Sequence, residues 1–412
     1  MDFQNMLQKY AELTVRVGLN LQPGQRLLIM KAPIQAAPLV REITTSAYQA
    51  GARLVDVMWG DEELLLTRFR HAPRDSFTEF PTWRSNGMLE TAKRSDAILS
   101  IQGSDPGLLD EQDPDTVATY QKTRWEHLAP TLEYIERQAT NWTVIAAPVA
   151  SWASKIFADL TPEIAEARLW EAIFDACRVT QADPFAAWQE HIQQLASRRS
   201  YLTQKGYTAL RFTAPGTDLT VGLPNGHIWI GGLDTTQGGI SFVPNLPTEE
   251  VYTLPHREQT QGVVTASMPL SYLGTLIQDF TLTFAEGRVV RATAAQGEAV
   301  LNKLLDTDEG ARRLGEVALV PHSSAIAQSG LLFYESLFDE NAASHLALGS
   351  AYKFNLAGGE AMSDDEFAAA GGNTSLVHVD FMIGSGEMDV DGIREDGTTE
   401  PVMRAGEWAF EA

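Results

Sequence analysis

About the first 190 residues alternate short apolar runs with amphipathic segments, and this alternation constrains the fold more than any other feature of the sequence. The apolar runs predict strands at Arg26–Met30, Leu54–Trp59, Ala97–Ile101 and Trp142–Ala146. Amphipathic segments between them indicate helices, and helices that connect successive strands make those strands parallel. The N-terminal part of the chain is therefore predicted to be an α/β domain with a mostly parallel, twisted sheet.

Turn and breaker residues predict where several of these helices end. Gly51 follows the helical pattern of Pro38–Ala50, and Pro130 lies just beyond that of Pro114–Leu128. A long helical region, Thr161–Ser200, then bridges this domain to the next. No Gly-x-Gly-x-x-Gly motif follows the first strand, so the phosphate-binding loop of a dinucleotide fold is missing.

After this helical region the pattern changes to that of antiparallel strands. Ala209–Thr213 and Asp218–Gly222 flank Ala214–Thr217, whose proline and glycine predict the turn of a hairpin. Four more strands and a helix are predicted, in order, at Ile228–Gly232, Val263–Pro269, Phe280–Phe284, Val289–Ala295 and Gln296–Asp306. We therefore expect an α/β domain at 1–190, with the helical bridge at its end, and an α+β domain with mixed and antiparallel strands at 191–412.

The chain is strongly acidic, with 54 Asp and Glu residues against 31 Lys and Arg and a formal net charge of −23. Nucleic acids and anionic membranes attract basic surfaces, so neither is expected as a partner. The single cysteine, Cys177, excludes an intrachain disulfide, and its apolar helical setting predicts a buried structural residue. There is no signal-peptide pattern, and the longest uncharged stretch, Gln259–Gln278, is not predominantly apolar, so we expect a cytoplasmic protein.

Histidine is scarce, with 8 residues in 412, so the placement of each one is informative. His378 and Asp380 are two residues apart in a predicted strand, Ser375–Met382, and therefore project from the same face. This pair forms a metal chelate, unless the strand is an exposed one with alternating polar residues. Glu340 precedes His345 by five residues, about 140° on a regular helix, so a loop or strand end is needed to bring them together.

Further carboxylates stand out by their context. Glu249 and Glu250 follow Phe242–Leu246, and Glu316 begins an apolar strand, where burial without a partner is costly. For each of them the alternative is an exposed surface glutamate. One acid of the Glu249/Glu250 pair would complete a set of carboxylates and imidazoles with Glu316, Glu340, His345, His378 and Asp380. Such an oxygen-rich set suits a hydrolytic site in which two metal ions activate a water.

Several stretches resemble those of a known family. Asp339–Gly349, together with Tyr352, resembles the hallmark stretch of the aminopeptidase T family of dinuclear metallo-aminopeptidases. Similar stretches follow the family in order along essentially the whole chain, at Asn20–Gln25, Arg70–Pro73, Arg168–Phe174, Gly216–Leu223, Asn245–Val251 and Asn373–Asp380. The resemblance implies an α/β N-terminal domain, a C-terminal domain that holds both metals, and a homodimer whose sites face an internal cavity.

The resemblance also implies roles for individual residues. The metal ligands would be Glu250, Glu316, Glu340, His345, His378 and Asp380, and Tyr352 would line the active site. None of these ligands is missing from the chain. Which carboxylate bridges the metals stays open, as does the choice among zinc, cobalt, manganese and magnesium.

Together these residues lead to one functional hypothesis, a metal-dependent aminopeptidase that releases N-terminal amino acids from peptides with a water activated by two divalent cations. Glu316 or Glu340 would move the water's proton to the leaving amine, and Tyr352 would donate a hydrogen bond to the developing oxyanion. One alternative is a metal-dependent phosphoesterase, although the ligand segments offer few cations to a phosphate, namely Arg257, Arg312, Arg313 and Lys353. The other is a non-catalytic, two-lobed binding protein.

Overall fold

The computed structural model describes residues 2–272 and 275–411, and the chain folds into two compact units. Unit 1 consists of Met1–Glu190 and Leu233–Pro247, and unit 2 of His191–Gly232 and Thr248–Ala412. The sequence predicts a continuous second domain at 191–412, whereas in the structure the short segment 233–247 returns to unit 1.

Main-chain hydrogen bonds explain this return of Leu233–Pro247. Val144 N donates to Pro244 O at 2.7 Å, and Val144 O accepts from Leu246 N at 2.9 Å. The segment therefore pairs with a strand that lies about a hundred residues earlier in the chain. A contact of that sequence separation leaves no mark in the local hydrophobic pattern.

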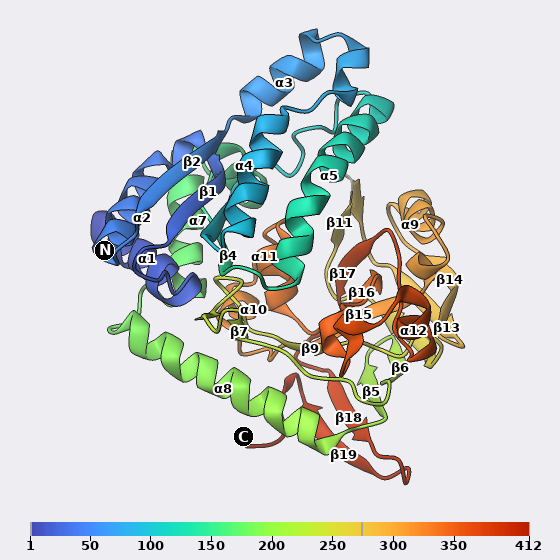
Figure 1. Ribbon diagram of the computed structural model, residues 1–412. Coiled ribbons are helices and arrows are strands. Elements are labelled where there is room, and N and C mark those ends of the chain that lie inside the picture. Colours follow the sequence, from blue (N-terminus) through green and yellow to red (C-terminus); the bar gives the residue numbers. More distant parts are fainter. Residues whose placement is uncertain (1, 273–274, 412) are drawn as a thin grey trace. The chain divides into compact units, whose positions relative to one another are not determined.

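Unit 1 contains the parallel sheet that the strand–helix alternation predicts. Its helices are α1 (Phe3–Leu13), α2 (Ala37–Gln49), α3 (Glu62–His71), α4 (Thr82–Lys93), α5 (Pro114–Glu136), α6 (Ala150–Ile156) and α7 (Pro162–Ala176), and its strands are β1 (Arg26–Pro33), β2 (Leu54–Gly60), β3 (Ala97–Gln102), β4 (Trp142–Ala146), β7 (Asp234–Thr235) and β8 (Ser241–Phe242). The parallel order is β2-β1-β3-β4. The chain passes from β1 to β2 through α2, and it then crosses back past β1 to reach β3. As a result, α2 and α4 lie on opposite sides of β1 (Figure 1).

Two boundaries in unit 1 differ from the prediction. β1 does not end at Met30, because a register shift at Lys31, which has φ +56°, lets Ala32 and Pro33 pair with β2. α5 does not end before Pro130 but continues through it. Pro130 and Glu126, whose carbonyl loses its helical partner, are both exposed, so the helix continues at a surface that water can reach.

Unit 2 is built mainly from antiparallel strands. Its helices are α8 (Pro184–Lys205), which begins in unit 1, α9 (Glu298–Leu305), α10 (Ala325–Ser329), α11 (Ser336–Asp339) and α12 (Asp364–Ala369), and its strands are β5 (Ala209–Ala214), β6 (Thr217–Gly222), β9 (Val251–Thr253), β10 (Thr260–Thr265), β11 (Leu270–Tyr272), β12 (Thr275–Ile277), β13 (Thr281–Ala285), β14 (Arg288–Thr293), β15 (Leu314–Leu319), β16 (His345–Gly349), β17 (His378–Met382), β18 (Asp389–Ile393), β19 (Thr399–Arg404) and β20 (Glu407–Trp408). An eight-stranded sheet runs β14-β13-β10-β6-β5-β18-β19-β20, and a four-stranded sheet runs β17-β16-β15-β9. The α+β prediction is confirmed, as is the hairpin of β5 and β6.

One strand predicted in unit 2 is wrong, and another is shorter than predicted. In place of a strand, Ile228–Gly232 forms one isolated bridge, between Ile230 and Tyr252. At Gly231 a Cβ atom would lie 2.4 Å from Glu250 O, so the main chains approach there too closely for a regular strand with side chains. β10 ends at Thr265, before the predicted Pro269.

No membrane-crossing element was expected, and the uncharged stretch Gln259–Gln278 is extended rather than helical in its described residues, where it forms β10, β11 and β12. Within the described ranges, none of the helices combines the length and the apolar character that a bilayer crossing requires.

The four-stranded sheet separates an apolar face from a polar one, because successive side chains of a strand point to opposite faces. One face carries Val317, Leu319, Leu346, Leu348 and Phe381, which are buried in the main core of unit 2. Residues of the eight-stranded sheet contribute to the same core. Glu316, Ala318, Ala347, Asp380 and both histidines, His345 and His378, alternate with these residues and therefore project from the other face.

Close packing between β16 and β17 generates a stability prediction. Gly349 has φ +107°, and a Cβ atom there would lie 2.0 Å from Val377 O, whereas Gly358 has φ +74° and open space around it. We expect Gly358→Ala to lower the free energy of unfolding by about 1–2 kcal/mol through backbone strain alone. Gly349→Ala should cost about 1–3 kcal/mol more, through the clash with the main chain of Val377, just before β17.

Urea unfolding of the wild type and both variants measures the difference in the free energy of unfolding, provided that the slope of this free energy against urea concentration is the same for all three. Equal losses for Gly349→Ala and Gly358→Ala would contradict the close approach of β16 and β17.

Candidate metal centre

Polar side chains from neighbouring strands gather on the polar face of the four-stranded sheet. Glu316 lies on β15 opposite Ala347 of β16, and Ala347 lies opposite Asp380 of β17. His345 is two residues before Ala347 and His378 two before Asp380, so all of them share this face. The small side chain of Ala347 separates the two carboxylates without filling the space between them.

Distances divide these residues into two groups that share Glu316. His345 Nε2 lies 3.1 Å from Glu250 Oε2 and 3.5 Å from Glu316 Oε1. His378 Nε2 lies 3.6 Å from Glu316 Oε2 and 3.4 Å from Asp380 Oδ1. Within residues 2–272 and 275–411, Glu250–Glu316–His345 and Glu316–His378–Asp380 each bring three potential ligand atoms within 4.8 Å of one another. Glu316 thus offers one oxygen to each group.

Main-chain carbonyls orient both imidazoles. His345 Nδ1 lies 3.0 Å from Ala343 O, and His378 Nδ1 lies 2.7 Å from Ser350 O. A carbonyl only accepts hydrogen bonds, so each Nδ1 carries a hydrogen and each Nε2 faces the carboxylates. This is the orientation in which a histidine ligates a metal through Nε2.

The buried charges strongly perturb one another. Burial raises the pKa of Glu316 to about 7, although the neighbouring histidines oppose this shift. Burial alone would lower the pKa of His378, but Asp380 and Glu316 outweigh it and raise this pKa to about 10. The pKa of His345 is likewise raised, because Glu250 and Glu316 outweigh its burial. The cluster therefore draws in positive charge, which protons or metal cations supply.

Two buried carboxylate oxygens indicate where cations would bind. Glu250 Oε2 and Asp380 Oδ1 are buried and accept no hydrogen bond in the described part of the chain, despite their short distances to imidazole nitrogens. A buried acceptor without a partner is costly, and a metal ion between oxygen and nitrogen would satisfy it. The residues present therefore fit divalent cations that accept mixed oxygen and nitrogen ligands.

The structure distinguishes the two acids of the Glu249/Glu250 pair. Glu250 turns toward His345, whereas Glu249 Oε2 lies 3.6 Å from His191 Nε2, away from the two groups. Both glutamates are buried, which excludes the alternative of exposed surface residues. The opposite directions follow from the extended main chain that leads into β9.

Glu340 lies close to the cluster but belongs to neither group of three. It begins a short 3₁₀ turn, Glu340–Ala342, and Ala343 then adopts an extended conformation that leads into β16. This irregular path is the loop that the five-residue spacing to His345 predicts. Burial, followed by the charges of Glu250 and Asp380, raises the pKa of Glu340 well above its ordinary value.

Tyr352 borders the cluster at its accessible side. Its ring centroid lies 4.9 Å from that of His378, and 36% of the residue is exposed. Partial burial and the nearby carboxylates raise the pKa of Tyr352 well above its ordinary value, so its hydroxyl keeps its proton and is available as a hydrogen-bond donor.

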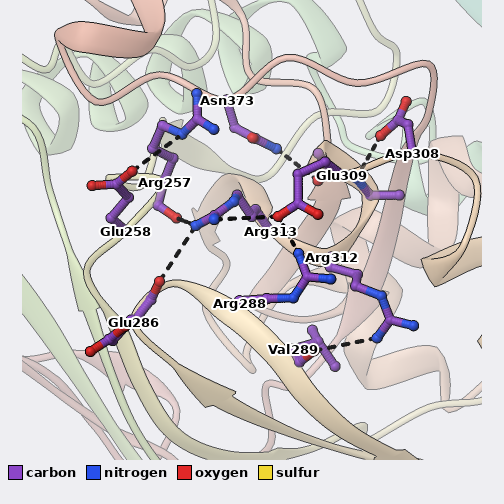
Figure 2. Close-up of polar contacts among 12 residues, drawn as sticks. Arg257, Glu258, Glu286, Arg288, Val289, Asp308, Glu309, Arg312, Arg313 and Asn373 are labelled. Atoms are coloured by element: carbon purple, nitrogen blue, oxygen red, sulfur yellow. Dashed lines mark hydrogen bonds and ion pairs between the residues drawn. The ribbon is translucent and has the colours of Figure 1, made fainter.

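The cations encoded near the proposed ligands pair with other carboxylates, and Figure 2 shows Arg257 beside Glu258 and Arg313 beside Glu309. The pairs are Arg257 with Glu258, Arg312 with Asp306, Arg313 with Glu309, and Lys353 with Asp364. Arg313 also donates to Arg257 O at 2.8 Å, and Arg288 contacts Glu309. A phosphate at the cluster would have to displace these partners, which disfavours the phosphoesterase alternative.

Comparisons with known proteins agree with this geometry. The sequence profile described as thermophilic metalloprotease (M29) matches residues 3–408. The chain is 50% identical to Aminopeptidase 2 of Geobacillus stearothermophilus, over 99% of both chains, and 50% identical to Aminopeptidase T of Thermus thermophilus, over 98% of this chain and 99% of that one. The solved structure of wild-type AmpT from Thermus thermophilus matches with a TM-score of 0.94 and 49% identity, covering 99% of this chain and 100% of that one.

A thermal-shift experiment tests whether this cluster binds cations. After removal of metal with a chelator, adding Mn²⁺ or Zn²⁺ should raise the Tm of the wild type, since a ligand that binds only the folded state stabilises by about 2.7 kcal/mol at 100 times its Kd. His345→Ala should lose most of this gain. The matched control is His322→Ala, which removes an exposed imidazole and should keep it. A full gain in His345→Ala would contradict cation binding at the cluster.

Proposed function

The chain belongs to the thermophilic metalloprotease (M29) family and is a metal-dependent aminopeptidase, and we propose that it releases N-terminal amino acids from peptides with a water whose pKa two bound divalent cations lower toward neutrality. The proposed ligands are Glu250, Glu316, Glu340, His345, His378 and Asp380. The native metal among zinc, cobalt, manganese and magnesium is left open by this oxygen-rich set.

One observation carries the proposal of two cations, namely the contact of Glu316 with both imidazoles. A carboxylate that gives one oxygen to each of two ligand groups has the geometry of a bridge. We therefore assign the bridging role to Glu316, with Glu250 and His345 on one side and His378 and Asp380 on the other.

Because Glu316 is engaged on both oxygens, Glu340 is the better candidate for general base. In the proposed reaction Glu340 accepts a proton from the attacking water as the water oxygen bonds to the scissile carbonyl carbon. Glu340 then gives this proton to the leaving amine nitrogen as the peptide bond breaks. Its position beside the cluster but outside both groups of three supports this role.

Tyr352 is proposed to stabilise the oxyanion that develops on the scissile carbonyl oxygen. Its exposure and its contact with His378 support this role, because the hydroxyl then lies beside the cluster and within reach of a bound substrate. A donor aimed at the developing charge acts mainly in the transition state, so its loss lowers kcat.

Further expectations from the sequence stay predictions: a homodimer, a cytoplasmic location, and no nucleic-acid or membrane partner. The net charge of −23 supports the last of them. A catalytic role for the C-terminal part is supported by the membership of all six proposed ligands in unit 2.

Replacing the shared carboxylate tests the mechanism directly. Glu316→Gln keeps the size of the side chain but removes its charge, so hydrolysis of an aminoacyl anilide should fall by at least about 100-fold. The matched control is Glu360→Gln at an exposed position of unit 2, which should keep full activity. Circular dichroism should show cooperative unfolding of both variants, and retained turnover in Glu316→Gln would overturn the assignment.

A substrate comparison tests the reaction class. We expect hydrolysis of an aminoacyl nitroanilide, because a free α-amine is drawn to an acidic cluster, and little hydrolysis of the N-acetylated analogue or of nitrophenyl phosphate. Initial rates at one concentration of added cation measure the three. Preference for the phosphate would favour the phosphoesterase, and no turnover of any of them would favour the binding protein.

A further inference from the structure

Asn341 is a buried polar residue for which the proposed reaction has no use. It lies between Glu340 and Ala342 in the short turn that leads to His345, and it is completely inaccessible to solvent. A buried amide must satisfy both its carbonyl oxygen and its amino group. The partners that Asn341 has for these two atoms are therefore informative.

The carbonyl oxygen of its side chain holds the main chain next to a proposed ligand. Asn341 Oδ1 accepts a hydrogen bond of 2.7 Å from Glu249 N, across 92 residues of sequence. The following residue is Glu250, whose carboxylate faces His345. The amide of Asn341 thus fixes the main chain from which the Glu250 side chain departs.

The amino group of the same side chain reaches the proposed general base. Asn341 Nδ2 donates to Leu337 O at 3.0 Å and to Glu340 Oε1 at 3.4 Å. In the described part of the chain, this is the one hydrogen bond that the carboxylate of Glu340 accepts. The longer distance to Glu340 makes it the weaker of the two bonds.

We propose that Asn341 is a positioning residue, a single planar amide that fixes the carboxylate of Glu340 relative to that of Glu250. The inference rests on the proposed function, in which these two acids are the general base and a ligand. The two carboxylates repel each other, so without a link they would separate. Because both hydrogen bonds involve one planar amide, they fix the Glu340 carboxylate relative to the main chain that leads to Glu250. Without this amide, neither acid would hold the geometry that proton transfer requires.

Asn341→Asp separates the two halves of this link. The aspartate keeps an oxygen for Glu249 N but places its second oxygen against Glu340 and Leu337 O, where a donor is needed. With saturating cation and an aminoacyl anilide, we expect kcat to fall at least tenfold while KM stays within about threefold of the wild type, as for loss of an outer partner of a metal site. Asn341→Ala, which adds no charge, should also lose kcat.

The matched control is Asn141→Asp in unit 1, which carries none of the proposed ligands. Asn141 is as fully buried, and it also combines a donated bond, to Leu19 O at 2.7 Å, with an accepted one, from Gln25 Nε2 at 2.8 Å. We expect Asn141→Asp to lower the Tm as Asn341→Asp does but to leave kcat within threefold. If Asn341 were only structural, both variants would lose Tm and both would keep kcat. A loss of kcat in Asn341→Asp alone therefore indicates a positioning role.

Three outcomes would overturn the proposal. They are a kcat within threefold of the wild type in Asn341→Asp, an equal loss of kcat in Asn141→Asp, and loss of cooperative unfolding in both Asn341 variants, which would make the residue part of the scaffold. A wild type that fails to cleave the anilide with cation present contradicts the proposed function itself. An active wild type with an unimpaired Asn341→Asp contradicts only the role of Asn341.

Discussion

The shared carboxylate of Glu316 is the contact on which the rest of the site depends. Its two oxygens face two imidazoles, and a main-chain carbonyl behind each ring keeps Nε2 directed at the carboxylates. Lone pairs that face carboxylate oxygens repel unless positive charge lies between them. The site is therefore unfavourable by itself and requires both a cation and a scaffold that does not relax.

The four-stranded sheet supplies that scaffold through simple alternation. Every second residue of β15, β16 and β17 is anchored in the core of unit 2, so the intervening polar residues cannot move without disturbing apolar packing. On the polar face the small residues Ala318, Ala347 and Gly349 alternate with the proposed ligands and leave room between them. Groups on strands with anchored neighbours are held more precisely than groups on loops.

Local periodicity in the sequence was sufficient for a large part of this structure. The alternation of short apolar runs and helices predicts β1 to β4 and that they run parallel, and a spacing of two predicts that His378 and Asp380 share a face. Contacts of large sequence separation could not be predicted in this way. The return of Leu233–Pro247 to unit 1 depends on a pairing with β4, and the bridging geometry of Glu316 depends on the register of three strands. The passage of α5 through Pro130 depends on its exposure, which one sequence does not reveal.

Asn341 shows the same limit in the chemistry of the site. Glu340 and His345 nearby can be recognised in the sequence as ionisable residues. The role of the neutral Asn341 side chain can be inferred only from its hydrogen bond to a residue 92 positions away. Its neutrality also suits the position between two acids. A lysine or arginine there would neutralise the carboxylates and weaken their attraction for cations, and an aspartate would add repulsion. An apolar residue would leave Glu249 N without its acceptor. An asparagine holds the two acids in place and leaves their charge to the cations.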